Sequence, residues 1–322
     1  MRAMTFSEPG GPEVLEPTEV DDPQPGEGEI LVRVRVAGVN FIDTYQRSGA
    51  YPLPLPATLG REGAGEVIAV GPGVTDRRKG DRVAWLDGLG SYAQMLAVPA
   101  ERTVVLPDAV DLETAAAVMI QGCTAHFLSH STYPLGEDTT ALVYAAAGGV
   151  GRLLVQLAKH RGATVLACTS SDEKAAEVRR LGADAVIRYR DENVVARVRE
   201  LTEGRGVDVV YDSVGRDTFD ASLGALRVRG TLVVFGQSSG PVPPVDIQTL
   251  NRHGSLHLTR PSISHFTASD GELAWRAGAL LQFVASGLLD VRVHERYPLE
   301  EAGDAHRALE SGRTSGKLLL LP

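Results

Sequence analysis

Cysteine is scarce in this chain, since Cys123 and Cys168 are the only two among 322 residues. Two thiols are too few for a disulfide framework or for a four-cysteine zinc lobe, so we exclude both. The first residues, MRAMTFSEPGG, contain no apolar segment of the kind that a secretory signal carries. From these absences we expect a protein of a reducing compartment, the cytoplasm.

Long apolar runs and an excess of positive charge are also missing. No run approaches the roughly eighteen apolar residues that a membrane span requires, so we expect no span. Lys and Arg number 32 against 41 Asp and Glu, a formal net charge of −9. This balance argues against nucleic-acid binding, because a phosphate backbone needs basic patches. The composition, 43% hydrophobic and 23% charged, is that of a globular protein, and the length predicts two domains.

The first part of the chain, up to about residue 106, is typical of short strands between Gly, Pro and Asp. In EILVRVRV, apolar side chains at Ile30, Val32, Val34 and Val36 recur at every second position, which fits a half-buried strand. GAGEVIAVGPGV, GDRVAWL and GSYAQMLAV repeat this rhythm. We predict an antiparallel β-rich domain, followed by a helix that Asp111 caps.

Strands and helices alternate from residue 140 onward. We expect helices that include residues 172–182, 193–204 and 216–230. Apolar strands separated by helices are typical of a parallel sheet that is covered on both faces. We therefore predict an α/β fold with a Rossmann-type, doubly wound parallel six-stranded sheet. Its strands are expected at TALVYA, TVLACTS, DAVIRY, VDVVYDSVG, TLVVFG and SLHLTR.

The sequence after about residue 262 is helical again and ends in GKLLLLP, a predicted strand. We expect this tail to return to the first domain, which would make that domain discontinuous. The expected domains are a β-rich one of residues 1–120 and 263–322, and one of residues 121–262 that holds the parallel sheet.

A glycine-rich loop follows the first of these strands. VYAAAGGVGRL has the spacing Ala146-x-Gly148-x-x-Gly151, a relaxed form of the G-x-G-x-x-G fingerprint. Such a loop lets the backbone approach a pyrophosphate, and the N–H groups at the helix start bind it. A tight strand-to-helix turn is the alternative, but the position between a buried strand and an amphipathic helix favours a dinucleotide. The predicted contacts are Ala147, Gly148, Gly149, Val150 and Gly151.

The end of the second strand distinguishes between the two common dinucleotides. NAD enzymes usually place a carboxylate there for the ribose 2′-hydroxyl, whereas CTSSDEK offers Ser170, Ser171 and Lys174. Two hydroxyls and a cation suit a 2′-phosphate, so these residues predict NADPH. Asp172 does not fit unless it caps the next helix, and the alternative for Lys174 is a solvated helix residue.

Seven segments carry a family resemblance when they are taken in order: AGVNFIDTYQRSGAYP, LGREGAGEVIAVGPGV, GDRV, AAAGGVG, YDSVGRDTF, FGQSSG and TRPS. Over essentially its whole length the chain resembles the zinc-free NADPH:quinone oxidoreductases, the zeta-crystallin-like branch of the medium-chain dehydrogenase/reductase superfamily. The resemblance implies a GroES-like substrate domain built from both termini, a central Rossmann domain and a cleft between them. It also implies NADPH as cofactor, quinones as substrates, and a homodimer or homotetramer.

Zinc-dependent relatives differ from this chain at two ligand positions. They place a cysteine where this chain has Asn40, and a histidine where it has Arg61 ahead of Glu62. An amide and a cation are poor zinc ligands, so we expect no metal. His126 and His130 have the spacing of a helical metal site, but HFLSH lacks the glutamate of the protease motif, so we interpret them as helix-packing residues.

The resemblance places Asn40 and Asp43 near the nicotinamide, as hydrogen-bonding groups for cofactor or substrate. The alternative is that both are turn or strand-end residues. Tyr45 and Tyr51 are expected either to donate a hydrogen bond to a developing oxyanion or to form a wall of the cleft. The same resemblance carries over further cofactor contacts, most of them at strand ends: Thr124, Tyr189, Ser213, Gly215, Phe235, Gly236, Ser238, Arg260 and Lys317.

Metal-free quinone reduction is the expected function, because a quinone gains aromaticity as it takes up electrons and needs little electrophilic help. Whether electrons leave singly or as a hydride stays open. The alternative is reduction of an activated C=C bond in an enal or enoyl thioester, since zinc-free enoyl reductases share the fold and the context of Tyr51. A third hypothesis, an NADPH-binding structural or RNA-binding protein, is disfavoured by the acidic charge. The edge strand SLHLTR is expected to pair across a dimer.

Overall fold

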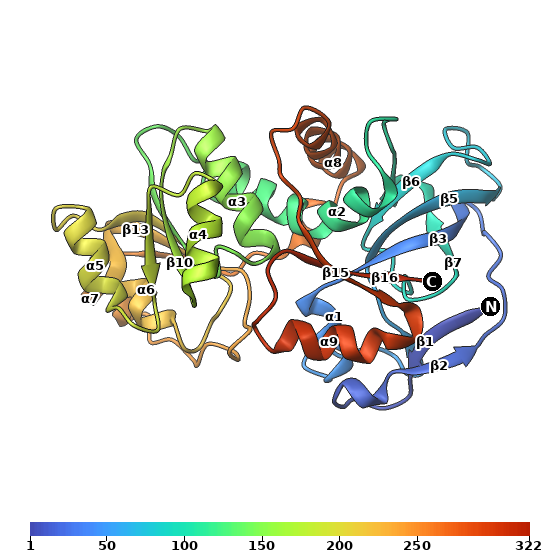
Figure 1. The fold of residues 1–322 in the computed structure, drawn as a ribbon, viewed down its shortest axis with the longest axis horizontal. Helices are drawn as coiled ribbons and strands as arrows, with labels where there is room; N and C mark the ends of the chain where they lie inside the picture. The colour runs from blue at the N-terminus through green and yellow to red at the C-terminus, as the bar shows by residue number, and fades with distance from the viewer. The chain divides into compact units, whose positions relative to one another are not determined.

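A computed structural model describes the backbone of residues 1–322 and every side chain except that of Asp270. The chain divides into two compact units. Unit 1 consists of Met1–Cys123 and Thr267–Pro322, and unit 2 consists of Thr124–Phe266. Figure 1 shows the elements in chain order, with the blue start and the red end of the chain both belonging to unit 1.

Unit 1 is built on a seven-stranded sheet. The last strand of the chain, β16 (Lys317–Leu321), pairs antiparallel with β3 (Glu29–Val39), so the carboxyl terminus completes a sheet that begins near the amino terminus (Figure 1). The strand order is β15 (Val293–Pro298), β16, β3, β5 (Glu62–Val70), β6 (Arg82–Leu86) and β8 (Thr103–Val105), and β7 (Met95–Pro99) also pairs with β3. A smaller sheet holds β2 (Glu16–Glu19), β1 (Arg2–Phe6) and β4 (Ala57–Thr58).

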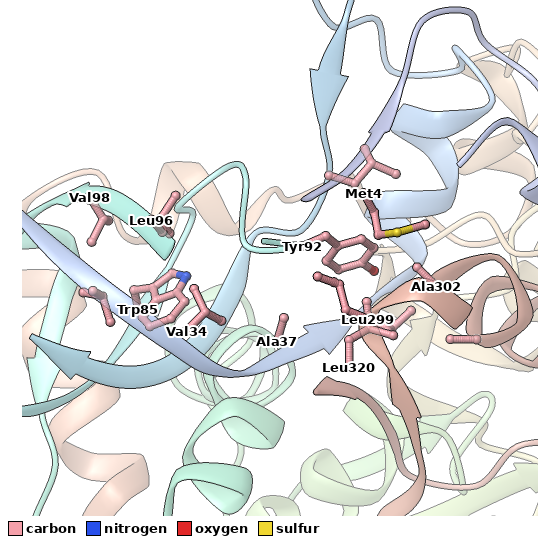
Figure 2. Close-up of a cluster of buried hydrophobic side chains, with 14 of the residues drawn as sticks. Met4, Val34, Ala37, Trp85, Tyr92, Leu96, Val98, Leu299, Ala302 and Leu320 are labelled. Carbon is pink, nitrogen blue, oxygen red and sulfur yellow. The ribbon is translucent and has the colours of Figure 1, made fainter. Parts of the chain in front are cut away.

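The core of unit 1 draws on both ends of the chain. In Figure 2, Met4 and Tyr92 lie close to Leu299 and Leu320, which come from the last 25 residues or so. Burying one such apolar side chain contributes about 1.5–3 kcal/mol, so the carboxyl-terminal segment is a substantial part of this core. Tyr92 is fully buried and its hydroxyl therefore needs a polar partner inside the unit.

Unit 2 contains the six-stranded parallel sheet that the sequence predicts, which confirms the α/β fold with a separate β-rich part. The order is β11 (Ala185–Arg188), β10 (Thr164–Thr169), β9 (Thr140–Val143), β12 (Val207–Asp212), β13 (Leu226–Val234) and β14 (His257–Thr259). The connecting helices include α3 (Gly149–His160), α4 (Asp172–Arg180), α5 (Val194–Leu201) and α6 (Phe219–Ala225). Because all neighbours are parallel, every strand ends at the same edge of the sheet.

The helix expected over residues 216–230 is shorter in the structure. α6 ends at Ala225, and Leu226 already pairs with Val207 at the start of β13. The register then shifts, and Arg229 adopts a φ of 59°, so residues 226–230 form an irregular extended segment. Strand pairing of apolar side chains therefore overrides the helical pattern here. Asp172 is likewise not the cap of α4, since the hydroxyl of Ser171 accepts the hydrogen bond from the N–H of Lys174.

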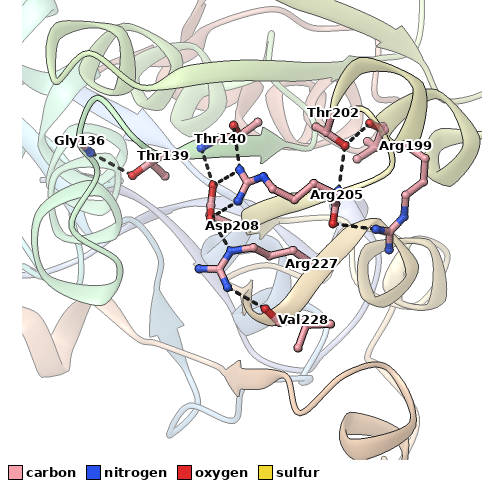
Figure 3. A network of polar contacts seen from close by, with 11 residues as sticks. Gly136, Thr139, Thr140, Arg199, Thr202, Arg205, Asp208, Arg227 and Val228 are labelled. Carbon is pink, nitrogen blue, oxygen red and sulfur yellow. Dashed lines mark hydrogen bonds and ion pairs between the residues drawn. The ribbon is translucent and has the colours of Figure 1, made fainter.

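A buried carboxylate ties the amino ends of three strands together in unit 2 (Figure 3). Asp208 accepts hydrogen bonds from both terminal nitrogens of Arg205 at 2.8 and 2.9 Å, from the N–H of Thr140 at 2.8 Å and from Arg227. Burial alone would raise the pKa of Asp208, but the hydrogen bonds from Arg205 and Arg227 lower it to about 2. This network stabilises the end of the sheet opposite to the edge where the strands finish.

Candidate active site

The carboxyl edge of the parallel sheet collects most of the predicted cofactor residues. Open α/β sheets bind their ligands at this edge. Ser170 and Ser171 directly follow β10, and Tyr189 directly follows β11. The other predicted residues follow strands that end at the same edge. They are Ser213 and Gly215 after β12, Phe235, Gly236 and Ser238 after β13, and Arg260 after β14.

The glycine loop between β9 and α3 has no room for a side-chain atom at Gly151. A Cβ atom on Gly151 would lie 2.3 Å from the carbonyl oxygen of Ala145 and 2.8 Å from the Cα of Ala146. Both are backbone atoms, which cannot yield as a flexible side chain does. Gly151 is therefore required for the start of α3 to pack against the loop, as the fingerprint predicts.

The N-cap of α3 offers no side-chain acceptor to the N–H groups of the first turn. Gly148 is the N-cap and has no side chain to accept from them. By contrast, Ser171 caps α4 and Asn193 caps α5 within the same unit. The first N–H groups of a helix have no partner inside the helix, and the helix dipole adds positive potential there. This turn is suited to a pyrophosphate, so the residues fit a dinucleotide.

Asp212, at the end of β12, organises the next loop of this edge. Its fully buried carboxylate accepts from the N–H groups of Val214 at 2.8 Å and Gly215 at 3.0 Å. The hydroxyls of Thr218 and Ser222 donate to it at 2.7 and 2.8 Å. Four donors around one carboxylate hold Ser213 to Gly215 in a single conformation. The sequence motif YDSVG contains this residue, but its spacing does not reveal that the side chain points inward.

Positive charge gathers beyond the end of β10. The pKa of Lys174 is lowered by burial and by the neighbouring charge of Arg190. The charges of Glu173 and Glu177 act on Lys174 in the opposite direction. The carboxylate of Asp172, which would repel a 2′-phosphate, forms an ion pair with Arg188 at 2.9 Å. Two cations near each other suit an anionic group such as a 2′-phosphate.

In unit 1, Asn40 and Asp43 lie at the start of α1 (Phe41–Arg47). The N–H of Asn40 donates a 2.8 Å hydrogen bond to Oδ2 of Asp43, three residues later, in the manner of a capping box. The hydroxyl of Tyr92 donates to the same oxygen at 3.0 Å. Burial raises the pKa of Asp43 to about 7, although the bonds from Asn40 and Tyr92 and the charge of Lys317 act in the other direction.

The side chain of Asn40 lies beside the buried ion pair of Lys317 and Glu62 and is hydrogen-bonded to both. Lys317 donates to Oδ1 of Asn40 at 2.8 Å and also to the carboxylate of Glu62, and Asn40 donates to Glu62 at 2.6 Å. The N–H of Ile120 donates to the second oxygen of Glu62 at 2.6 Å. Gly38 leaves room for the pair, since a Cβ there would lie 2.4 Å from Glu62 and 2.7 Å from Lys317. The predicted cofactor contact Lys317 is thus 1% exposed and bonded to protein groups.

These residues do not fit a zinc ion. The oxygen of Asn40 already accepts from an ammonium group, and Arg61 is paired with Asp87. Among the residues whose side chains are described, no group of three or more His, Cys, Asp or Glu is arranged to hold a metal. The rings of His126 and His130 stack in parallel, with centroids 4.0 Å apart and an interplanar angle of 4°. The side chains of Asn40 and Arg61 are thus engaged in a hydrogen bond and an ion pair.

Three aromatic side chains line one side of α1 and the segment after it. The rings of Tyr45 and Tyr51 meet edge to face with centroids 5.4 Å apart, and Phe41 lies 6.2 Å from Tyr45. Tyr51 is 36% exposed, so the cluster reaches the surface of unit 1. Aromatic faces and phenolic hydroxyls together suit a flat ring with polar oxygens. Thr124, the remaining predicted contact, lies near the end of α2 (Leu112–Phe127) and is almost buried.

Two family models match the chain. The model described as zinc-binding dehydrogenase covers residues 149–285, and the model described as alcohol dehydrogenase GroES-like domain covers residues 26–108. No helix of the described part of the chain is long and apolar enough to cross a membrane.

Curated relatives and a solved structure match over nearly the whole length. A quinone oxidoreductase of Pseudomonas aeruginosa is 46% identical over 323 residues, which covers 100% of this chain and 99% of that protein. A 2-haloacrylate reductase of Burkholderia is 40% identical, covering 99% of this chain and 98% of that protein. The crystal structure of the Escherichia coli quinone oxidoreductase complexed with NADPH superposes with a TM-score of 0.98 at 43% identity, covering 100% of both chains.

Proposed function

Because the chain belongs to the quinone oxidoreductases of the medium-chain dehydrogenase/reductase superfamily, we propose that it reduces quinones with electrons from NADPH. The observation that carries this proposal is full-length similarity to quinone oxidoreductases, together with the glycine loop before α3 and the cations Lys174 and Arg190 near the end of β10. Bound NADPH supplies the electrons, and the protein supplies binding, orientation and a proton.

We assign the cofactor to the carboxyl edge of unit 2. Gly148 to Gly151 bind the pyrophosphate through the first turn of α3, and Ser171 with Lys174 bind the 2′-phosphate. Tyr189 covers the adenine, and the loops after β12 and β13 contact the nicotinamide end. The assignment is supported by the position of each residue at a strand end and by the fixed conformation that Asp212 imposes on Ser213 to Gly215.

We assign the substrate side to the residues of α1 and the segment after it. Asn40 and Asp43 provide hydrogen-bonding groups, while Tyr45 and Tyr51 provide aromatic faces and phenolic donors. A quinone needs little more, because its conjugated carbonyls accept electrons readily and the product ring is aromatic. The poor fit of Asn40 and Arg61 to zinc agrees with an acceptor that requires no Lewis acid.

A second candidate function is reduction of an activated C=C bond. The similarity to a 2-haloacrylate reductase at 40% identity favours this candidate, because that protein acts on a conjugated alkene. Such a reaction also takes a proton at carbon after the electrons arrive, so it makes a stronger demand on an acid than quinone reduction does.

An acceptor screen separates the two candidates. Initial rates are measured with NADPH and with NADH against a 1,4-quinone, an enal, a haloacrylate and an enoyl thioester, each with and without a metal chelator. We expect the quinone with NADPH to give the highest kcat/KM, and the chelator to leave it unchanged. Negligible quinone turnover beside efficient reduction of an alkene would contradict the proposed substrate class.

We further propose that the protein is a homodimer of the cytoplasm. The strand β14 lies at the edge of the parallel sheet, where it leaves backbone groups available for another strand. Apolar side chains are exposed around it, with Ile247 at 73%, Val228 at 66% and Leu258 at 37%. Both cysteines are free and buried, which agrees with a reducing compartment. Light scattering at micromolar concentration is expected to give twice the chain mass, and a monomer would reject the dimer.

A further inference from the structure

A row of hydrogen bonds leads from Asp43 through the core of unit 1 to its surface. The hydroxyl of Tyr92 lies 3.0 Å from Oδ2 of Asp43 and 3.1 Å from Nε2 of His306. Arg47 lies 3.0 Å from Nδ1 of His306 and pairs with Glu310 at 2.7 Å. Asp43, Tyr92 and His306 are fully buried, whereas the Glu310 side chain is 37% exposed.

The guanidinium group of Arg47 determines which group donates and which accepts in each hydrogen bond of this row. A guanidinium group only donates, so Nδ1 of His306 accepts and the proton of the neutral ring is on Nε2. Burial and the charge of Arg47 lower the pKa of His306 to about 3, which keeps the ring neutral. Nε2–H then donates to the oxygen of Tyr92, and the hydroxyl of Tyr92 donates to Asp43. Oδ2 of Asp43 is consequently an acceptor with two fixed donors, Tyr92 and the N–H of Asn40.

The other oxygen of Asp43 is in a different situation. Among the described side chains, Oδ1 has no hydrogen-bond partner although it is buried. A buried carboxylate oxygen without a donor disfavours the ionised form of the group, whereas the bonded oxygen Oδ2 is stabilised as an acceptor. Oδ1 is therefore the oxygen of Asp43 on which a proton is retained.

The remaining charged groups around Asp43 come from α1 itself and from the elements packed against it. The charge of Lys317 on β16 lowers the pKa of Asp43, and the charge of Glu62 on β5 raises it. The two members of this buried ion pair therefore act on Asp43 in opposite directions. Arg47 on α1 reaches Asp43 only through the neutral ring of His306 on α9 (Ala302–Glu310) and the hydroxyl of Tyr92. Tyr92 itself stays protonated, because burial and then the charge of Asp43 raise its pKa well above the usual value.

We propose that Tyr92, His306 and Arg47 are positioning residues of the reaction, which hold Asp43 through Oδ2 and keep Oδ1 as the atom that carries the proton consumed when a quinone is reduced. The inference rests on the proposed quinone reduction. Quinone reduction takes up two electrons and two protons, of which the bound NADPH supplies both electrons and one proton. The second proton leaves Oδ1 of Asp43 as its O–H bond breaks and becomes a hydroquinone O–H. A proton from solvent then restores the carboxyl group.

The pH dependence of kcat/KM with a quinone tests this inference. The wild-type rate is expected to fall on the alkaline side with a midpoint near the pKa of Asp43, about 7. In Tyr92→Phe the ionised carboxylate loses a donor, so the midpoint is expected to move up by about one pH unit. Tyr211→Phe is the matched control, because Tyr211 is also fully buried and donates to backbone oxygens of Leu128 and Tyr133. This control is expected to leave the midpoint unchanged.

The variant Asp43→Asn provides a second test of the same inference. Its amide oxygen is still able to accept from Asn40 and Tyr92 and its NH2 group replaces the protonated oxygen, so the variant resembles the protein with Asp43 protonated. It has no acidic proton, and we expect its rate to fall about 100-fold and its profile to become flat across the neutral range. Infrared difference spectra between wild type and Asp43→Asn, recorded without quinone, are expected to show a carboxyl band that disappears between pH 6 and pH 8.

His306→Leu and His306→Gln supply the test of positioning. Leucine removes the donor to the Tyr92 oxygen but leaves the Tyr92 hydroxyl bonded to Asp43, so it is expected to move the midpoint in the same direction as Tyr92→Phe and by less. Glutamine offers an amide donor and restores the midpoint in part. Equal midpoints in wild type, Tyr92→Phe and His306→Leu would overturn the inference, as would full quinone turnover by Asp43→Asn. A wild-type protein without quinone turnover at any pH would instead contradict the proposed function, and the infrared titration would still decide whether Oδ1 holds a proton.

Discussion

Lys317 donates a 2.8 Å hydrogen bond to the side-chain oxygen of Asn40, a residue 277 positions earlier in the chain. Both side chains are buried, and the carboxylate of Glu62 receives hydrogen bonds from both. The family resemblance of the sequence implies that Asn40 stands where zinc-dependent relatives carry a cysteine. In this protein that side chain lies beside an ammonium group, which an amide and a carboxylate hold.

Removing one partner of this ion pair is expected to be costly. Lys317→Met leaves Glu62 as an unpaired buried charge, which we expect to lower the free energy of unfolding by about 3–5 kcal/mol. The double variant Glu62→Gln/Lys317→Met buries no charge and is expected to recover most of this loss. Urea denaturation of the single and double variants at neutral pH measures both values. Losses that simply add in the double variant would show that the two residues are not coupled.

The raised pKa of Asp43 makes stability depend on pH. Its folded-state value of about 7 lies above the ordinary 3.8, so folding favours the protonated form. The stabilisation is complete below the ordinary pKa and is lost as the pH rises through the folded-state pKa. Asp43→Asn does not titrate, so the unfolding free energy of wild type relative to this variant is expected to fall by about 3–4 kcal/mol between pH 4 and pH 7.5. A constant difference across that range would contradict the burial of this carboxyl group.

Gly151→Ala tests the glycine loop. The new methyl group would lie 2.3 Å from the oxygen of Ala145, so the start of α3 has to move away from the loop. We expect the Kd for NADPH to rise at least about tenfold, equal to ~1.4 kcal/mol. Gly136→Ala is the control within the same unit, since a Cβ there meets nothing within 4 Å. Fluorescence titration with NADPH measures both variants, and equal affinities would contradict the role of the loop.

Two buried aspartates of β12 allow a paired test of the sheet's two ends. Asp212→Asn replaces one carboxylate oxygen by an NH2 group, so either the N–H groups of the loop after β12 or the hydroxyls of Thr218 and Ser222 lose their acceptor. We expect this loop to be held less firmly and NADPH to bind about tenfold more weakly. Asp208→Asn weakens the bonds to Arg205 and Arg227 at the opposite end. That variant is expected to lose about 1–3 kcal/mol of unfolding free energy with unchanged NADPH affinity. Titration calorimetry and urea denaturation of both proteins separate the two effects.

The sequence by itself determined the parallel sheet, the glycine loop and the family. Alternation and helical spacing are local patterns, and a strand–loop–helix order such as that around Gly151 is visible within a few dozen residues. The local pattern predicts too long a helix after β12, because Leu226 pairs with Val207 and this contact between distant residues leaves no trace in the local periodicity.

Only the tertiary structure decided what the buried polar groups do. Asp43, Tyr92 and His306 lie far apart in the sequence, and no local pattern marks the last two as a row of donors behind the first. The sequence gives Lys317 as a cofactor contact implied by the resemblance and does not reveal its neighbours, and pairing of β16 with β3 places it on Asn40 and Glu62. The physical reason is that the charge state and direction of a polar side chain depend on what packs around it, and packing is a property of the folded chain.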